Sequence, residues 1–346
     1  MKTKQDIEDN NESDIESNIE PHWSAIKERG SMLGIETLVF IYKIFGKIFF
    51  SICLTPVMVY FYLTGTRARQ ATAHYLDNYH TFHGQSKKQG VARFIEGFKV
   101  FFSFGLSIVD KFDAWLGKVK FEDVDIVGDE GYQSLSTGKG AVILSAHLGN
   151  MELCRAIFTH EDNKKPLNVI TYNKHSPSFS NFLKKVNADS AINFVHIDNF
   201  GPDDTIKLKQ KIEDGEAVVI FADRTSVNNP NSVNFVPFLG EDAPFAIGPF
   251  ALATIMDCPV YTIFCLKKQG RYCTYIEKLA DPTKVRRKER QQYFQQLTQR
   301  FAERLEKHIQ LAPYQWYNFF NFWQTVAKPS IEPKSASTPE SNSASK

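Results

Sequence analysis

The chain has 346 residues, of which 42% are hydrophobic and 23% are charged, with a net charge of +2. This composition is typical of a globular protein long enough for one large domain or two smaller ones. The near-neutral charge gives no electrostatic reason to expect a nucleic-acid partner. Five cysteines without a C-x-x-C pair favour reduced thiols in a cytoplasmic domain and argue against a disulfide framework.

Both ends of the chain are polar, and an apolar region follows the first of them. We expect residues 1–30 and 326–346 to be disordered. Residues 48–65 carry no charge, and a helix that crosses a bilayer core requires about 20 apolar residues. We therefore predict an apolar helical membrane anchor within residues 31–119, which either spans the bilayer or lies in its interface. Pro56 is expected to kink it. A buried core helix is the alternative.

Residues 91–118 form a second segment with apolar side chains at approximately helical spacing. The same spacing fits a membrane-facing helix and a helix packed against a soluble domain. The sequence leaves both interpretations open.

From about residue 120 the hydrophobic pattern changes to short apolar runs that alternate with amphipathic stretches. The predicted strands are residues 141–146, 167–172, 192–197, 217–222, 259–266 and 271–279. The predicted helices are residues 151–160, 177–187, 203–214, 244–256 and 284–310. This order predicts an α/β catalytic domain over residues 120–325, with a mixed, mostly parallel sheet flanked by helices.

The first of these strands leads into a histidine and, five positions later, a carboxylate. On one continuous helix, His147 and Glu152 would point about 140° apart. They can meet if His147 lies in the loop after the strand and Glu152 lies in the first turn of the next helix. Gly149 permits a tight turn, and Asn150 is a candidate N-cap. Glu152 would then orient the imidazole as a general base.

A simpler interpretation is that Asn150 caps the helix, Glu152 complements the helix dipole and His147 is incidental. Other catalytic motifs are missing from the sequence. It contains no G-x-S-x-G elbow, no Walker A loop and no H-E-x-x-H pair. We therefore expect no metal and no cofactor.

The motifs taken together resemble those of the lysophospholipid acyltransferase superfamily. Within it, the chain is most similar to the late acyltransferases of bacterial lipid A biosynthesis, the lauroyl/myristoyl transferase type. An apolar anchor precedes three motifs in the family order, and the resemblance covers about residues 35–325. The motifs are HLGNME (147–152), FADRTSVNNPNSVNFVPFLG (221–240) and GPFALATIMDCPV (248–260).

The resemblance implies a fold, a reaction and a location. A fatty acyl group would pass from a thioester of acyl carrier protein or coenzyme A to a hydroxyl of a lipid or glycolipid. His147 would remove the proton of that hydroxyl, and Glu152 would hold the imidazole. The enzyme would act at the cytoplasmic face of a bacterial inner membrane, without nucleic acid.

The resemblance also implies substrate-binding residues. Arg224 would bind a phosphate of the donor's carrier arm or of the acceptor, Asp223 would orient Arg224, and Asn150 would contact substrate. An apolar wall for the acyl chain would be formed by Phe235, Val236, Pro237, Phe238 and Gly240. The alternatives are a surface ion pair of Arg224 with Asp223 or Asp203, and a buried edge segment at residues 235–240.

Three further stretches bear on the substrates. Tyr172-Asn173 replaces a Tyr-Arg pair of the family, and PYQWYNFFNFW (313–323) lacks the basic residues that the family tends to have there. Both departures favour an amphiphilic acceptor other than a phosphorylated lipid A disaccharide. The basic cluster KVRRKER (284–290) could meet anionic headgroups or an acidic carrier protein, or could be a solvated helix start.

Two other functions fit the same residues. A hydrolase could use the His147–Glu152 pair to activate water. A non-catalytic membrane protein could use the apolar cleft to hold a lipid.

Overall fold

A computed structural model describes residues 32–115, 117–158, 165–171, 192–196, 201–226 and 229–326. Four expectations concern residues outside these ranges. They are the disordered residues 1–30, the Tyr172-Asn173 pair, the helix over residues 177–187 and the tail beyond residue 326.

A seven-stranded sheet forms the centre of the α/β part of the chain, in the order β1-β9-β8-β2-β5-β3-β4. Neighbouring strands are parallel, except that β8 and β9 form an antiparallel hairpin. The strands are β1 (Val124–Val127), β2 (Ala141–Ser145), β3 (Leu167–Thr171), β4 (Ile192–His196), β5 (Ala217–Phe221), β8 (Val260–Lys268) and β9 (Arg271–Ala280). The predicted mixed, mostly parallel sheet is confirmed.

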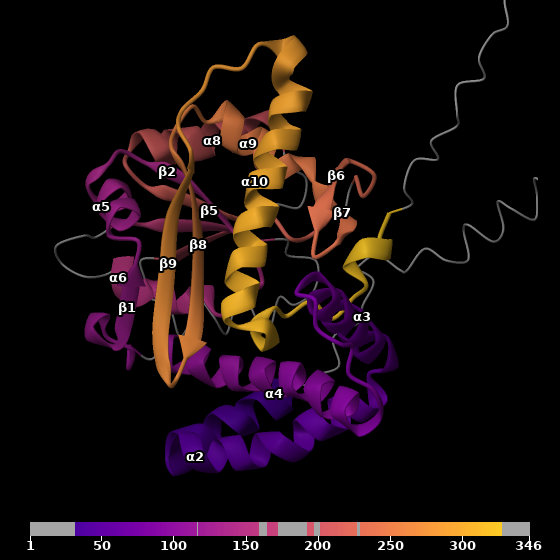
Figure 1. The fold of residues 1–346 in the computed structure, drawn as a ribbon. Coiled ribbons are helices and arrows are strands. Elements are labelled where there is room, and N and C mark those ends of the chain that lie inside the picture. The colour runs from indigo at the N-terminus through magenta and orange to yellow at the C-terminus, as the bar shows by residue number, and fades with distance from the viewer. Residues whose placement is uncertain are drawn as a thin grey trace, which may run out of the picture.

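Both faces of this sheet are covered, as the unbroken apolar runs require. In β2, Val142 and Leu144 point into one buried cluster, and Ala141 and Ile143 point into another. The first cluster includes side chains of α8 (Pro202–Glu213), α9 (Ile247–Ile255) and α10 (Arg290–Leu311). The second includes side chains of α5 (Asp129–Thr137), the 3-10 turn η3 (Met151–Cys154) and α6 (Arg155–Phe158). Figure 1 shows α10 running along the sheet.

A separate antiparallel ribbon, β6 (Val233–Phe238) and β7 (Glu241–Ala246), lies beside α10 (Figure 1). This corrects the prediction of a helix over residues 244–256, because α9 begins only at Ile247. The described residues also include short 3-10 turns: η2 (Phe121–Asp123), η5 (Arg287–Glu289), η6 (Pro313–Gln315) and η7 (Phe322–Gln324).

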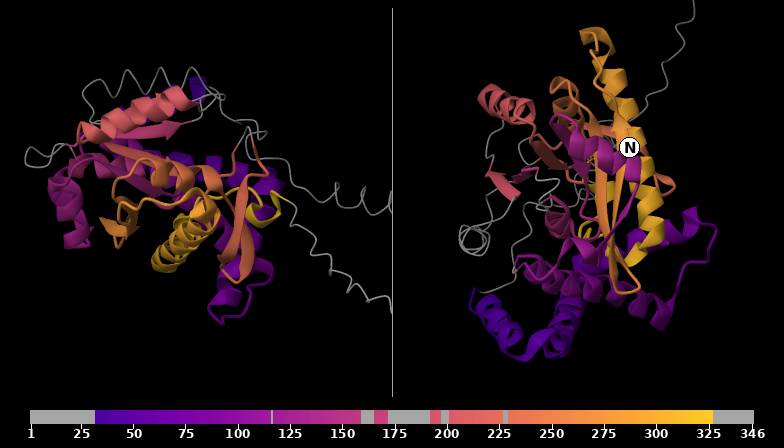
Figure 2. Two further views of the ribbon diagram at one scale, coloured as in Figure 1. Left: turned by 90° about the horizontal axis from the view of Figure 1, so that it is seen from above. Right: turned by 90° about the vertical axis from the view of Figure 1, so that its left-hand side faces the viewer.

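In the described part of the chain, three helices precede the sheet: α2 (Met32–Thr64), α3 (Thr66–Phe82) and α4 (Gly90–Trp115). The break in α2 lies at Gly46, where φ is 75°, and Pro56 is accommodated within the helix. α2 packs along α4, and small residues allow this close approach. A Cβ on Gly97 would lie 2.5 Å from the Tyr62 hydroxyl, and one on Gly105 would lie 2.9 Å from the Met58 side chain. Figure 2 shows the same pair of helices from two further directions.

Candidate active site

The loop after β2 is held by backbone hydrogen bonds on two sides. The Tyr317 amide donates to the His147 carbonyl and the Gly149 amide donates to the Gln315 carbonyl, each at 2.8 Å. On the other side, the Asn150 amide donates to the Cys265 carbonyl at 2.8 Å. The loop is therefore fixed between the C-terminal segment and β8, at the carboxyl end of a parallel strand, where ligands of α/β proteins usually bind.

Gly149 is required by the backbone at this point. Its φ is +72°, in the left-handed region, and a Cβ there would lie 1.9 Å from the Cys265 carbonyl oxygen. The predicted tight turn is therefore present, and the close approach of β8 is a second reason for glycine.

Replacing Gly149 by alanine is expected to lower the free energy of unfolding by at least about 3 kcal/mol, because a left-handed alanine and a backbone collision are both unfavourable. Gly248→Ala is the matched control, since a Cβ at Gly248 meets no atom within 4 Å. Its expected effect is within about 1 kcal/mol of wild type. Equal unfolding midpoints for the two variants in denaturant titrations would contradict this explanation.

The imidazole of His147 is hydrogen-bonded to Asp223. Nδ1 lies 2.8 Å from Oδ1 of Asp223, and the backbone amide of His147 donates to Oδ2 at 2.9 Å. Oδ2 also accepts the indole N–H of Trp316 at 3.1 Å. This corrects the expected contact between His147 and Glu152, because Asp223 occupies the position on the ring that Glu152 was predicted to take.

The charges of this pair favour a neutral imidazole with a free Nε2. Burial alone would raise the pKa of the Asp223 carboxyl, but the charge and hydrogen bonds of His147 and the charge of Arg224 hold it well below its usual range. An ionised carboxylate can only accept, so Nδ1 carries the proton. Burial and the positive charge of Arg224 lower the pKa of His147, against the pull of Asp223. The His147 side chain is 39% exposed and thus open to a substrate.

Glu152 lies in the first turn after the loop, as predicted, but its partner is a cation of α4. Its Oε1 is 3.0 Å from Nζ of Lys111, and both side chains are partly exposed. Lys111 is close enough to His147 for its charge to help lower the pKa of that imidazole. The pair therefore connects α4 to the loop after β2.

Asn150 does not cap the following turn with its side chain. Its Nδ2 donates to the Ser107 carbonyl of α4 at 3.1 Å, and its buried Oδ1 has no hydrogen-bond partner among the described residues. The backbone carbonyl of Asn150 accepts from Leu153 instead. The side chain fixes the loop to α4, so the predicted cap is wrong.

Arg224 is held by the C-terminal aromatic segment, residues 313–323. Its guanidinium donates to the Asn318 side chain at 2.7 Å and to the Tyr317 carbonyl at 3.1 Å, and it lies 4.5 Å above the Phe320 ring. Toward Asp223 it donates to the backbone carbonyl, at 3.3 Å. The Asp223 carboxylate is occupied by His147 and Trp316, so its main contact is with the imidazole and not, as predicted, with Arg224.

The predicted apolar wall forms β6 and the turn that follows it. Val236 and Phe238 are buried, Phe235 is half-buried, and Pro237 and Gly240 are exposed. Phe238 packs edge-on against Trp316 at a centroid distance of 5.4 Å. Through this contact the predicted wall reaches the ring that bonds to Asp223.

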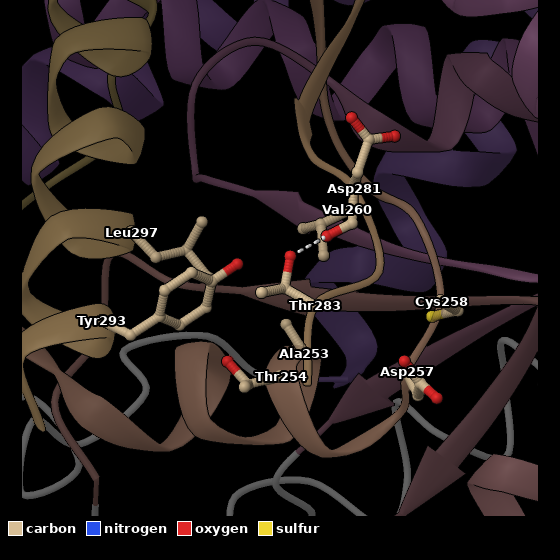
Figure 3. Close-up of a pocket in the computed structure, with 9 residues that line it drawn as sticks. All are labelled: Ala253, Thr254, Asp257, Cys258, Val260, Asp281, Thr283, Tyr293 and Leu297. Carbon is tan, nitrogen blue, oxygen red and sulfur yellow. Dashed lines mark hydrogen bonds between the residues drawn. The ribbon is translucent and has the colours of Figure 1, made fainter. Parts of the chain in front are cut away.

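A small pocket with a cavity volume of about 10 Å³, room for about one water molecule, lies elsewhere (Figure 3). It is lined by Ala253, Thr254, Asp257, Cys258, Val260, Asp281, Thr283, Tyr293 and Leu297. Val260 starts β8 and pairs with Val142 near the start of β2, so the pocket lies at the opposite edge of the sheet from His147. Ligand pockets usually exceed about 300 Å³. No group of three His, Cys, Asp or Glu side chains among the described residues could hold a metal ion.

The sequence contained a signal for Asp223 as the partner of His147. β2 and β5 are adjacent, parallel and in register, with Ser145 opposite Phe221. Residues 141–147 (AVILSAH) and 217–223 (AVVIFAD) correspond position by position. Two parallel strands of equal length bring the residues that follow them to the same edge of the sheet. No sequence pattern indicated that Trp316 and Lys111 lie at the site, because only tertiary packing brings them there.

One comparison with known proteins identifies the family of the chain. The sequence matches the family described as bacterial lipid A biosynthesis acyltransferase over residues 99–325, from within α4 to the end of the aromatic segment. A search of curated proteins finds no match. The matched region contains His147, Asp223 and Trp316. The chain belongs to the bacterial lipid A biosynthesis acyltransferase family, as its motifs predicted, and is an acyltransferase.

Proposed function

We propose that the protein transfers a fatty acyl group from a thioester of acyl carrier protein or coenzyme A to a hydroxyl of a lipid or glycolipid. The observation that carries the proposal is the hydrogen bond between Nδ1 of His147 and the ionised Asp223, which leaves Nε2 free to accept a proton. The proposed place is the cytoplasmic face of a bacterial inner membrane.

The reaction needs no acyl-enzyme. Nε2 of His147 removes the proton of the acceptor hydroxyl as its oxygen attacks the thioester carbonyl, and the imidazolium formed is stabilised by Asp223. The tetrahedral intermediate then expels the thiolate, which takes the proton from Nε2. Base assistance of this kind contributes a factor of about 10² to 10⁴ in rate.

Arg224 and Lys111 supply positive charge beside His147. Because Asn318 and Tyr317 hold the guanidinium, Arg224 presents a fixed charge to a phosphate of the donor's carrier arm or of the acceptor. The ring of Phe320, over which the guanidinium lies, supports an amphiphilic acceptor with an apolar part.

The pH dependence follows from the lowered pKa of His147. A general base works only when deprotonated, so we expect kcat/KM to fall as the pH drops through a value below 6.5, the ordinary pKa of histidine. A rate profile measured from pH 4.5 to 8.5 tests this expectation. An acid limb centred above 6.5 would contradict it.

Exposed apolar side chains support a membrane location. Helix α2 contains a 21-residue segment, Ile44–Thr64, that is apolar and long enough to cross a bilayer, and only 17% of its most apolar window is buried. The exposed apolar side chains of α2 are Phe40, Ile44, Phe45, Ile48, Phe49, Ile52, Val59, Tyr60 and Leu63, and those of α4 are Val91, Phe94 and Ile95. A patch of this extent marks an interaction surface, here called the apolar face.

The packing of α2 favours a position in the membrane interface over a crossing. Its other side contacts α4 along its length, from Tyr42 against Phe112 to Tyr62 against Phe94. The ammonium group of Lys47 lies 2.7 Å from the buried Asp110 of α4. A bilayer crossing by α2 would draw this carboxylate and its helix into the hydrocarbon, at high cost.

Ile48→Glu is expected to weaken binding to vesicles of phosphatidylethanolamine and phosphatidylglycerol at least about tenfold, because it replaces an apolar contact by a charge. Ile48 is 81% exposed on the apolar face. Ile206→Glu is the matched control, since Ile206 is 66% exposed on α8. Flotation assays measure both, and equal losses would count against the apolar face.

The basic cluster at residues 284–290 precedes α10 at the end of the molecule opposite α2 and α4 (Figures 1 and 2). Its cationic side chains are exposed. With the apolar face on the membrane, this position disfavours contact with headgroups.

The proposed function is tested by lipid profiling of a host strain that lacks the protein. We expect one lipid class to lose one acyl chain, and wild-type protein to restore that chain where His147→Gln does not. An unchanged lipid profile would overturn the proposal. Release of free fatty acid without any acylated lipid would identify a hydrolase.

A further inference from the structure

The indole of Trp316 donates the third hydrogen bond to the carboxylate that holds His147. Asp223 is completely buried, and each of its oxygens has a defined role. Oδ1 faces Nδ1 of His147, whereas Oδ2 accepts the His147 amide at 2.9 Å and the Trp316 indole N–H at 3.1 Å. The two donors hold Oδ2 in place. Because the carboxylate is planar and its two oxygens move together, they also determine the direction in which Oδ1 points.

The indole is held by close packing. Trp316 is completely buried and packs edge-on against Phe238, Phe322 and Tyr75, at centroid distances of 5.4, 5.7 and 4.9 Å. Its backbone forms an isolated antiparallel bridge with Leu148, the residue after the catalytic histidine. The ring and the catalytic loop are therefore parts of one rigid unit.

We propose that Trp316 is a positioning residue, which fixes the Asp223 carboxylate so that Oδ1 stays on Nδ1 of His147. This inference rests on the proposed acyl transfer, in which His147 is the base. Trp316 touches no reacting atom, so its contribution passes entirely through Asp223.

A matched pair of variants separates this role from packing. Trp323 is also buried, belongs to the same aromatic cluster and donates its indole N–H at 3.3 Å, but to the Phe238 carbonyl. Trp316→Phe is expected to lower kcat about 10- to 100-fold with KM within about twofold, since it removes a hydrogen bond to a charged group. Trp323→Phe is expected to leave kcat within about threefold of wild type.

The rates are measured as release of coenzyme A from palmitoyl-coenzyme A, with total lipids of the deletion strain as acceptors. The same substitution is made in an Asp223→Ala background. Without the carboxylate, removing the Trp316 N–H should change kcat less than about twofold, because residues that act through each other are not additive. An equal loss in both backgrounds, or equal losses for Trp316→Phe and Trp323→Phe, would overturn the inference.

Failure of this inference is distinguishable from failure of the proposed function. If His147→Gln keeps wild-type activity, the proposed function fails. If His147→Gln is inactive but Trp316→Phe behaves like wild type, the positioning role alone fails.

Benzothienylalanine at position 316 keeps both fused rings and lacks only the N–H, so it replaces phenylalanine if Trp316→Phe does not fold. It is expected to reproduce the loss of kcat, and wild-type kcat would overturn the inference.

Discussion

His147→Gln is expected to lower acyl transfer by a factor of about 10² to 10⁴, because glutamine is similar in length but its amide cannot accept the hydroxyl proton. The side chain is 39% exposed, so the main effect on the free energy of unfolding should be the lost hydrogen bond to the buried Asp223, which is expected to cost about 1 to 3 kcal/mol. Transfer from palmitoyl-coenzyme A and the thermal unfolding midpoint are measured on the same preparations.

His83→Gln is the control for this variant. His83 is partly exposed, and its Nδ1 contacts the Tyr79 carbonyl far from the catalytic loop in the sequence. It is expected to keep wild-type transfer. Activity of His147→Gln within about tenfold of wild type would show that the imidazole does not act as the general base.

Asp223→Asn is expected to reduce kcat at least about 100-fold, whereas Glu152→Gln should cost less than about fivefold. Asparagine would place an amide where three N–H donors point, so the imidazole would lose its orientation and the imidazolium its counter-charge. Glutamine at position 152 would only weaken a partly exposed pair with Lys111.

The comparison of these two carboxylates is decisive because Glu152 is close to the histidine in sequence, whereas Asp223 contacts its ring. Steady-state kinetics of both purified variants at pH 7.5 give the result. A large loss for Glu152→Gln with little loss for Asp223→Asn would restore the His147–Glu152 pair expected from sequence and contradict the geometry described above.

The sheet could be predicted largely because its strands are buried on both faces. A short, continuous apolar run such as β2 or β5 is stable mainly as a strand whose two faces are both buried, which is why it could be recognised. The edge strand β1 was missed, because Val124–Val127 is short and ends exposed. β7 was taken for the start of a helix, since residues 244–256 are apolar throughout and have no decisive period.

The site could be predicted only in part, because a spacing within one segment is visible in the sequence and a contact between segments is not. His147 after β2 and Glu152 in the next turn lie where the spacing placed them. The partner of the imidazole comes from β5, 76 residues away. Asp223 was recognised as a site residue but assigned to its neighbour Arg224, because adjacency in sequence was the only relation available.

The aromatic segment at residues 313–323 has a clearer role in three dimensions than in sequence. The backbone of Gln315 and Tyr317 and the side chains of Trp316 and Asn318 hold the loop after β2, Asp223 and Arg224 together. Residues 315–318 therefore support the proposed catalytic pair.

The central claim is that His147 directs an acyl group onto a lipid hydroxyl. Its most direct test is the stoichiometry of a single reaction, in which purified protein is given palmitoyl-coenzyme A and the lipids of the deletion strain. We predict one free coenzyme A for each lipid molecule that gains the mass of one palmitoyl group, with no free fatty acid. Coenzyme A released together with an equal amount of palmitic acid, and no heavier lipid, would contradict the claim.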